Sequence, residues 1–344
     1  MLSPPESAAA CVAVILVNWN AWRECIECLD SILAQEHANF HVFIVDNESA
    51  DRSLERIAAW CAEPAPDACW RSLPGVARYS AERPAVPVAT RSAVAADCAL
   101  PRAADDCRVT LLRSGGNLGF AGGCNAGIKA AGLERFEYFW FLNTDTVVDH
   151  RALSELIARA RLAPGMGIVG STVRFYHAPG TVQALSGGRL NRRNASSSHI
   201  GEGSSASKVP SDGAAVEKEL AFVFGASMLV SAVFVRDVGL MQEDYFLYYE
   251  EMDWAMRGGA RYRLGYAPQS HVFHKSGASS SKVMPRFSAA LFYGNRLRFA
   301  SRFLPDRMAA AKRKLFEEML RHVARGRWGL ARAIWSTLLT SPKV

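Results

Sequence analysis

Residues 11–49 read CVAVILVNWNAWRECIECLDSILAQEHANFHVFIVDNES, and the order of apolar and polar residues in this stretch decides the fold. Residues 12–17 form an unbroken apolar run, which is typical of a strand buried on both faces of a parallel sheet. The apolar spacing of residues 22–34 predicts a helix, and residues 41–45 predict a second buried strand. Another helix is expected over residues 53–60. This β-α-β-α order begins an open, mostly parallel sheet flanked by helices, so the predicted fold class is α/β.

The rest of the chain continues this pattern with two interruptions. Strands are expected at residues 108–112, 138–142, 167–173 and 263–266, and a helix at residues 151–161. Residues 62–107 are rich in Ala, Pro and Arg and show little periodicity, so we expect an insertion that is mostly loop. Residues 176–218 are rich in Gly, Ser and Asn and are expected to form a long polar loop that can include hairpins. Beyond residue 287 the pattern is helical and basic.

Length and composition exclude several classes of protein. With 344 residues, 49% hydrophobic and 21% charged, the chain has a globular composition and can form one large domain or two. A chain of this length buries enough surface to fold without a disulfide or a metal. No apolar run reaches the ~20 residues of a membrane-spanning helix. The apolar residues 8–17 are interpreted as a buried strand and not as a signal peptide.

The eight cysteines all lie between Cys11 and Cys124. Cys25 and Cys28 form a C-x-x-C pair, but the pair falls in a predicted helix and has no second pair at the spacing of a zinc site. We therefore expect free thiols, which favours a reducing cytoplasm over a redox or metal-binding role.

Positive charge is concentrated at the C-terminal end of the chain. The formal net charge is +7, and residues 283–344 contain ten Arg and three Lys against one Asp and two Glu. Such a segment suits an anionic partner: lipid headgroups, a polyphosphate or nucleic acid. A solvated helix face is the simpler interpretation. We do not expect nucleic acid, because no helix-turn-helix, RNP or zinc pattern accompanies the charge.

Large apolar residues lie among these basic residues and allow two interpretations. They are Phe292, Phe299, Phe303, Leu315, Phe316, Leu320, Trp328, Leu330 and Trp335. A basic amphipathic helix with Trp fits an interfacial membrane contact. The competing interpretation is packing against the rest of the chain or against a partner subunit.

Polar side chains follow three of the predicted strands at the point where each strand ends. They lie at residues 18–20, 46–49 and 143–145. Ligands of open α/β sheets bind beyond the carboxyl ends of the strands, so these groups are expected to converge on one edge. Asn143 and Asp145 lie two residues apart, and their oxygens suit Mg²⁺ or Mn²⁺ together with phosphate oxygens. A strand-end turn with an Asp helix cap is the alternative.

Two further clusters carry chemistry. Glu250, Glu251 and Asp253 place three carboxylates within four residues, and such crowding raises at least one pKa and suits a general base. The alternative is the acidic first turn of an amphipathic helix. His274 follows a predicted strand and precedes Lys275, Ser and Gly, which is a suitable loop for phosphate.

The glycine-dense loop at residues 114–127 leads into a predicted helix. It contains neither a dinucleotide fingerprint nor a P-loop lysine motif, and it does not follow the first strand. These features argue against an NAD-linked dehydrogenase. The glycines would let the backbone approach a ligand or a neighbouring strand closely.

Six short motifs occur in order along the chain. They are Val17-Asn18-Trp19-Asn20, Val45-Asp46-Asn47-x-Ser49-x-Asp51, Asn117-x-Gly119-Phe120-Ala121-Gly122-Gly123-x-Asn125, Asn143-Thr144-Asp145, Gly225-Ala226-Ser227-Met228 and Tyr249-Glu250-Glu251-x-Asp253-Trp254. Together they resemble the inverting family 2 glycosyltransferases of the GT-A fold, and among these the bacterial rhamnosyltransferase-like branch. The resemblance covers roughly residues 11–280.

The resemblance implies a site for a nucleoside-diphosphate sugar at the strand ends. The residues that would hold the base and ribose are Asn18, Asn20, Asp46 and Ser49, and those that would line the nucleotide or sugar pocket are Asn117, Gly119 and Phe120. Asn143-Thr144-Asp145 matches the family's D-x-D metal motif with Asn in place of the first Asp. Asp145 and His274 are the implied ligands of a divalent metal, Mg²⁺ or Mn²⁺. Lys275 would help to neutralise the leaving diphosphate.

The acidic cluster resembles the family's segment that holds the catalytic base, with Glu where the family often has Asp. Glu251 is the first choice for the base, and Glu250 or Asp253 the reserve. The base would take the proton of an acceptor hydroxyl while that oxygen attacks the anomeric carbon from the face opposite the diphosphate. Residues 176–218 would shape the acceptor side as a lid.

The resulting hypothesis is an inverting glycosyltransferase of cell-surface polysaccharide synthesis. The donor suggested by the resemblance is dTDP-rhamnose, with UDP- or GDP-sugars as alternatives, and the acceptor is a glycan or a lipid-linked glycan. Residues 10–282 would form the GT-A domain and residues 283–344 a basic helical extension, located in the cytoplasm at the inner face of the membrane. The alternatives are a catalytically degenerate nucleotide-sugar-binding protein and a transferase that acts on a small metabolite.

Overall fold

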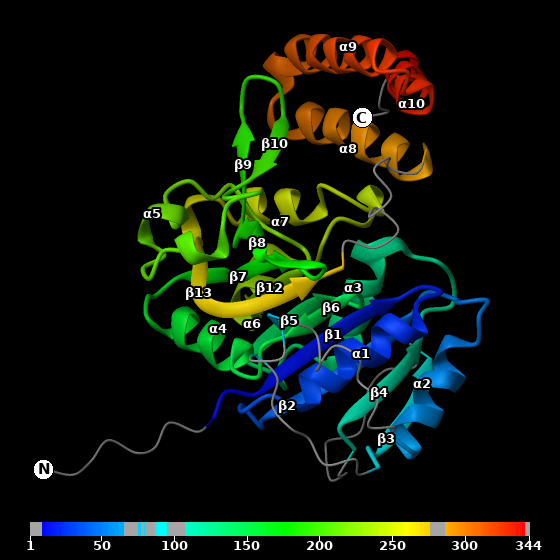
Figure 1. Cartoon of the computed structure of the whole chain (residues 1–344), viewed down its shortest axis with the longest axis vertical. Helices are drawn as coiled ribbons and strands as arrows, with labels where there is room; N and C mark the ends of the chain where they lie inside the picture. The colour runs from blue at the N-terminus through cyan, green and yellow to red at the C-terminus, as the bar shows by residue number, and fades with distance from the viewer. Residues whose placement is uncertain are drawn as a thin grey trace, which may run out of the picture.

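A mostly parallel sheet runs through the larger part of the molecule (Figure 1). The computed structural model describes residues 9–64, 75–76, 79, 87–94, 107–275 and 286–340. Within these residues the sheet has ten strands in the order β3-β4-β2-β1-β5-β12-β7-β13-β6, and β8 pairs with β7. The strands are β1 (Val12–Asn18), β2 (Phe40–Asp46), β3 (Thr90–Val94), β4 (Val109–Arg113), β5 (Tyr138–Asn143), β6 (Thr146–Val148), β7 (Met166–Phe175), β8 (Ala178–Leu185), β12 (Ser227–Ser231) and β13 (Arg263–His274). The predicted α/β class is confirmed.

Helices cover both faces of this sheet. They are α1 (Trp22–Leu33), α2 (Ser53–Ala62), α3 (Gly119–Ala131), α4 (Ala152–Arg161), α6 (Ala232–Val238) and α7 (Glu250–Gly258). Val12, Val14 and Leu16 of β1 pack in one apolar cluster with α1, α2 and α4. Ala13 and Ile15 point the other way and pack with α3, α6 and α7. This two-sided burial explains why residues 12–17 form an unbroken apolar run.

The helix α3 lies unusually close to β1. A Cβ atom built on Gly123 would lie 2.5 Å from Cγ1 of Val17, and one on Gly127 would lie 2.6 Å from Cγ2 of Ile15. Two of the glycines in the glycine-dense segment therefore serve close packing of helix on strand, the second of the two roles expected for them.

The segment at residues 62–107 contains an edge strand that the sequence did not predict. Strand β3 pairs in parallel with β4, and its residues are alternately exposed and half-buried. An edge strand with one half-buried face lacks the continuous apolar run of the central strands, so its pattern is weak. Most of the expected insertion, residues 65–74, 77–78, 80–86 and 95–106, lies outside the described residues.

The segment at residues 176–218 is more ordered than the long loop expected there. Strand β8 continues the main sheet beside β7. A small second sheet follows, formed by β9 (Gly187–Asn191), β10 (Ser196–His199) and β11 (Phe222–Val223), and a short helix α5 (Ala214–Glu217) lies between β10 and β11. Strands β9 and β10 form an antiparallel hairpin. The expected hairpin is present, and its exposed position explains the polar composition.

Three helices end the chain: α8 (Arg286–Phe303), α9 (Met308–Ala324) and α10 (Trp328–Leu339). They stack beyond α7 and the β9–β10 hairpin, at the top of Figure 1. An apolar cluster joins them to Met252 of α7 and to Tyr249 directly before it. Its members from the predicted list are Phe292, Phe299, Phe303, Leu315 and Leu330. Packing against the rest of the chain is therefore confirmed for these five. None of the described helices is long and apolar enough to cross a membrane.

Candidate functional site

The ends of β1 and β2 carry a connected polar network. Asn18 is fully buried, and its Nδ2 lies 2.8 Å from Oδ1 of Asp46 and 3.2 Å from Oγ of Ser49. The Ser49 hydroxyl donates to Asp46 Oδ1 at 2.6 Å and accepts from the backbone N–H of Asn20 at 2.8 Å. Asn20 Oδ1 in turn accepts from the N–H of Ala50 at 2.8 Å. The structure thus brings together all four residues expected to hold the base and ribose.

Asn47 belongs to this network and was not among the predicted site residues. Its Nδ2 donates to the carbonyl of Gly119 at 2.8 Å, which ties the end of β2 to the start of α3. Among the described residues, the buried Oδ1 atoms of Asn47 and Asn18 have no hydrogen-bond partner. Two buried amide oxygens without donors need an explanation, and a ligand N–H is one. The position of Asn47 directly after Asp46 was the available signal.

The predicted metal residues meet at the end of β5. Nε2 of His274 lies 3.1 Å from Oδ1 of Asp145 and 3.3 Å from Nδ2 of Asn143. The pairing of β13 with β6, with His274 opposite Thr146, brings the imidazole to this position. Nδ1 of His274 lies 2.9 Å from Oε1 of Gln183, a residue of β8 that the sequence analysis missed in its polar segment.

These contacts test whether the donor set fits a cation. Because Gln183 Oε1 is an acceptor, His274 donates from Nδ1 and its Nε2 faces the carboxylate of Asp145. An imidazole nitrogen and a carboxylate oxygen facing each other suit a divalent cation completed by ligand oxygens, or a proton on Nε2. No group of three or more His, Cys, Asp or Glu side chains with metal-site geometry occurs in the described part of the chain. The chain therefore offers two ligands, not a complete protein cage.

Lys275 lies beside this pair but is already engaged. Its backbone N–H donates to the carbonyl of Asp145 at 2.9 Å. Its ammonium forms an ion pair with Glu27 of α1 and lies 5.0 Å from the ring centroid of Tyr176. The Lys275 charge is therefore shared with Glu27 and is only partly available to a diphosphate.

The start of α3 contacts the segment before α7. Gly119 has φ +69°, and its N–H donates to Oδ1 of Asn117 at 3.2 Å. The N–H of Phe120 donates to the carbonyl of Phe246 at 2.7 Å. A Cβ atom on residue 119 would lie 2.4 Å from that carbonyl oxygen, so only glycine fits. The three residues expected to line the pocket therefore lie against the approach to the acidic cluster.

Three residues before α7 have positive φ angles, which is rare outside glycine. Phe246 has φ 60°, Tyr248 has φ 73° and Tyr249 has φ 75°. Bulky residues in this conformation cost free energy and persist only where surrounding contacts hold them, commonly at functional sites. Helix α7 then begins at Glu250.

Glu250, which is buried, and Glu251, which is half-buried, form an acidic pair at this helix start. Burial and the neighbouring Glu251 raise the pKa of Glu250 well above its ordinary value. Burial raises the pKa of Glu251 to about 7, and backbone N–H groups of Glu251 and Tyr249 limit the rise. Oε2 of each residue is buried without a hydrogen-bond partner among the described residues. A carboxyl with a pKa near neutrality and an uncommitted oxygen is suited to proton transfer.

Asp253 has a different environment from the two glutamates. It is fully buried, and its Oδ1 accepts from Arg257 Nε at 2.7 Å. Its Oδ2 accepts from Arg302 of α8 at 2.8 Å and from the hydroxyl of Tyr245 at 3.0 Å. Both oxygens are committed to permanent partners, so Asp253 is placed to hold α7 against α8, not to accept a proton from a ligand.

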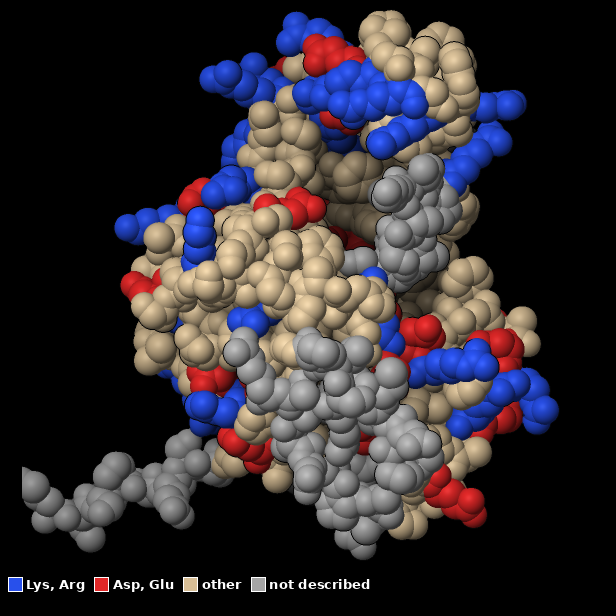
Figure 2. Space-filling model, in the orientation of Figure 1, with Lys and Arg blue, Asp and Glu red and all other residues tan. Residues whose placement is uncertain are grey.

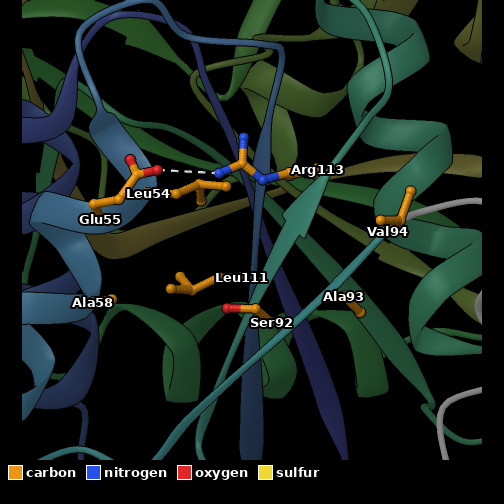
Figure 3. Close-up of a pocket in the computed structure, with 8 residues that line it drawn as sticks. All are labelled: Leu54, Glu55, Ala58, Ser92, Ala93, Val94, Leu111 and Arg113. Carbon is orange, nitrogen blue, oxygen red and sulfur yellow. Dashed lines mark hydrogen bonds and ion pairs between the residues drawn. The ribbon is translucent and has the colours of Figure 1, made fainter.

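A cavity of about 340 Å³ lies elsewhere, between α2 and the β3–β4 edge of the sheet (Figure 3). Its charged lining residues, Glu55 and Arg113, form an ion pair at 3.1 Å. Leu54, Ala58 and Leu111 add apolar side chains. None of the predicted site residues lines this cavity, so it does not mark the site.

Comparison with known proteins assigns a family to this arrangement. The model described as Glycosyl transferase family 2 matches residues 13–72 and 90–203, just over half of the chain. No curated protein sequence matches the chain significantly.

Solved structures resemble this chain, and the first described here shares its fold. One is the mannosyltransferase PcManGT from Pyrobaculum calidifontis in complex with GDP-Man and Mn²⁺, with TM-score 0.53 and 15% identity over 100% of this chain and 79% of that one. Another is S. aureus TarS in complex with UDP-GlcNAc, with TM-score 0.49 and 13% identity over 96% of this chain and 82% of that one. The predicted GT-A fold is confirmed.

Glu251 and Asp253 have different environments. Replacing each by its neutral amide should therefore change the free energy of unfolding in opposite directions. Asp253→Asn leaves two buried arginine contacts without their carboxylate and should lower the free energy of unfolding by about 3–5 kcal/mol. Glu251→Gln should raise it by about 1–3 kcal/mol at pH 8, because wild type must ionise a buried carboxyl there.

The two variants are compared with wild type by urea denaturation at pH 8 and pH 4. The raised pKa of Glu251 means that the native state binds more protons than the unfolded state between about 4.5 and 7. Wild-type stability therefore falls as pH rises through this window, and the advantage of Glu251→Gln should shrink toward pH 4. An advantage that does not change with pH would contradict the assignment.

Proposed function

Because this chain belongs to glycosyl transferase family 2, we propose that it transfers a sugar from a nucleoside-diphosphate donor to a hydroxyl group of a glycan or lipid-linked acceptor. The observation that carries the proposal is Oε2 of Glu251, which is buried and without a hydrogen-bond partner among the described residues. The alternative of a degenerate binding protein is disfavoured by this buried oxygen, because burying a polar atom without a hydrogen-bond partner lowers stability.

Glu251 is the proposed catalytic base. A pKa of about 7 leaves it substantially ionised at neutral pH and able to accept a proton from an acceptor hydroxyl. The oxygen freed in this way would attack the anomeric carbon from the face opposite the diphosphate, which inverts its configuration. Burial and the neighbouring Glu251 raise the pKa of Glu250 well above its ordinary value, which disfavours a second negative charge beside Glu251. Asp253 is no longer a reserve for the base, because its oxygens are taken.

The donor nucleotide is proposed to bind at the ends of β1 and β2. Asn18 and Asn47 each present a buried acceptor oxygen without a donor among the described residues, as a base or ribose would require. The complex of PcManGT with GDP-Man supports a nucleotide sugar as the donor. The motif resemblance favours dTDP-rhamnose, and UDP- and GDP-sugars are the alternatives.

Asp145 and His274 are the residues that would hold a divalent cation beside the diphosphate. A cation there would neutralise negative charge that develops on the leaving group. Gln183 orients His274 for this role through its contact with Nδ1. The Mn²⁺ present in the PcManGT complex supports this assignment. Asn143 contributes its amide near His274 Nε2, in the place of the carboxylate that the family's motif often has.

The outer surface of the C-terminal helices is the proposed membrane contact. Trp328, Arg332, Trp335 and Leu339 share one face of α10 and are all exposed. Lys and Arg side chains surround this end of the molecule (Figure 2). Exposed Trp and Leu flanked by basic residues suit the interface of an anionic bilayer. A lipid-linked acceptor would then be reached at the membrane surface, in polysaccharide synthesis.

Turnover tests the assignment of the base. Glu251→Gln should lower kcat by about 10²–10⁴-fold, because the amide cannot accept the proton, and nucleotide affinity should stay unchanged. Wild-type kcat should rise with pH and level off above the pKa of about 7. Release of nucleoside diphosphate from UDP-GlcNAc, GDP-mannose and dTDP-rhamnose is measured with Mn²⁺. Retained turnover in Glu251→Gln would move the base to Glu250.

Donor binding tests the metal residues. Asp145→Ala should abolish the extra thermal stabilisation that Mn²⁺ gives to the nucleotide-bound protein, since bound ligand stabilises the native state by mass action. Asp237→Ala is the control, because Asp237 lies on α6 and pairs with Arg261 far from the strand ends in the fold. An equal Mn²⁺ effect in wild type and Asp145→Ala would exclude Asp145 as a ligand.

Liposome flotation tests the membrane contact. Wild type should float with vesicles that contain anionic phosphatidylglycerol, and the double substitution Trp328→Ser and Trp335→Ser should remain in the dense fraction. Leu162→Ser removes an exposed apolar side chain outside the C-terminal helices, at the C-cap of α4, and should float like wild type. Failure of wild type to bind would refute the contact.

A further inference from the structure

One side chain of the C-terminal extension binds the segment with positive φ angles at residues 245–249, directly before α7. Asn295 lies in the middle of α8 and is 4% exposed. Its Nδ2 donates to three backbone carbonyls of the segment, at 2.6 Å to Tyr245, 2.8 Å to Leu247 and 3.0 Å to Tyr248. A single amide nitrogen thus satisfies three carbonyl groups.

The chemistry of this contact restricts what can replace Asn295. An amide nitrogen has two N–H donors, so one of the three hydrogen bonds is shared. The three carbonyl oxygens converge because two residues of the segment have positive φ angles. Phe246 lies between the first two carbonyl-bearing residues, and Tyr248 is itself the third. Without the Asn295 donors, the carbonyls of Leu247 and Tyr248 would lose this hydrogen bond in a buried space, and that of Tyr245 would keep only the N–H of Leu247 at 2.6 Å, so the strained backbone would relax. An ionised aspartate has the same shape but only acceptor oxygens, so it cannot donate hydrogen bonds to the three carbonyl groups.

The same face of α8 holds α7 itself. Arg302, seven residues after Asn295, donates to Oδ2 of Asp253 at 2.8 Å. Glu251 lies between these two attachments: the segment held by Asn295 ends at Tyr249, and Asp253 follows two residues after Glu251. The direction in which Glu251 projects is therefore set by contacts with α8 on both sides of it.

We propose that Asn295 is a positioning residue for glycosyl transfer, which holds residues 245–249 in the conformation that presents Glu251 to the acceptor hydroxyl. The inference rests on the proposed function, because the catalytic role of Glu251 is itself a proposal. It gives the C-terminal helices a part in the reaction that is separate from any membrane contact. Loss of the Asn295 donors should misplace the base without changing the donor pocket at the ends of β1 and β2.

The test compares Asn295→Asp and Asn295→Ala with Leu315→Ala in the full chain. Leu315 is fully buried on α9 in the same apolar cluster, so its truncation weakens the helical extension without removing a hydrogen bond to the segment. Two measurements are made: amide hydrogen exchange of the peptide that covers residues 244–252, and kcat and KM for release of nucleoside diphosphate from the three donors named above. The Ala variant serves if the Asp variant does not fold.

In the Asn295 variants we expect at least tenfold faster exchange in the peptide and a kcat lowered at least tenfold, with donor KM within twofold of wild type. Leu315→Ala should keep wild-type exchange in this peptide and a kcat within twofold. Unchanged exchange in the Asn295 variants, or an equal loss of kcat in Leu315→Ala, would overturn the inference. A wild type without turnover on any donor would overturn the proposed function, and the exchange comparison would then decide alone whether Asn295 holds the segment.

Discussion

The burial of two adjacent carboxyl groups, Glu250 and Glu251, is the constraint on which the rest of the site depends. Water cannot stabilise their charges, so the pKa of Glu250 rises well above its ordinary value and that of Glu251 rises to about 7. Such a pair destabilises the native state at alkaline pH and must be kept in place by other contacts. Two sets of contacts do this: the hydrogen bonds of Asn295 to the strained backbone before α7, and the contact of Arg302 with Asp253. Both come from α8.

The basic residues of the C-terminal extension divide into two groups with different surroundings. Arg296 is almost fully buried; it donates to the carbonyl of Asn194 in the β9–β10 connection and pairs with Glu318 of α9. Arg302 pairs with Asp253. Those on the outer faces of α9 and α10 remain exposed around Trp328 and Trp335. The sequence suggested that the positive charge of this segment serves an anionic partner. Some of this charge instead forms ion pairs within the protein, at Arg296 and Arg302.

The central part of the fold could be predicted because burial on both faces leaves a strong pattern in the sequence. Residues 12–17 and 41–45 lie in β1 and β2 as predicted, and the polar residues at their ends do converge. Strand β3 escaped prediction because an edge strand carries only a weak alternation. Strand β13 extends to His274, eight residues beyond the predicted end at residue 266, so His274 lies in the strand and does not follow it.

Asn295 and Gln183 could not be found in the same way. Asn295 lies in a helix with many polar residues, and a lone amide there has the pattern of a solvent-exposed residue. Its role depends on carbonyl groups about fifty residues earlier in the chain, which no local pattern reveals. Gln183 lies in a segment whose composition indicated a loop. Asp253, by contrast, matched the motif of the base, and its partners Arg257, Arg302 and Tyr245, which the sequence does not reveal, occupy both of its oxygens.

The contact between Asn295 and the segment before α7 also sets where this protein can be recombined with its relatives. A chimera that exchanges only the C-terminal helices would join a foreign α8 to carbonyl groups shaped by another backbone. The natural unit of exchange is therefore discontinuous: residues 245–253 and α8 belong to one inheritable module, although about thirty residues of chain separate them. A functional exchange of the C-terminal helices would require both parts to change together.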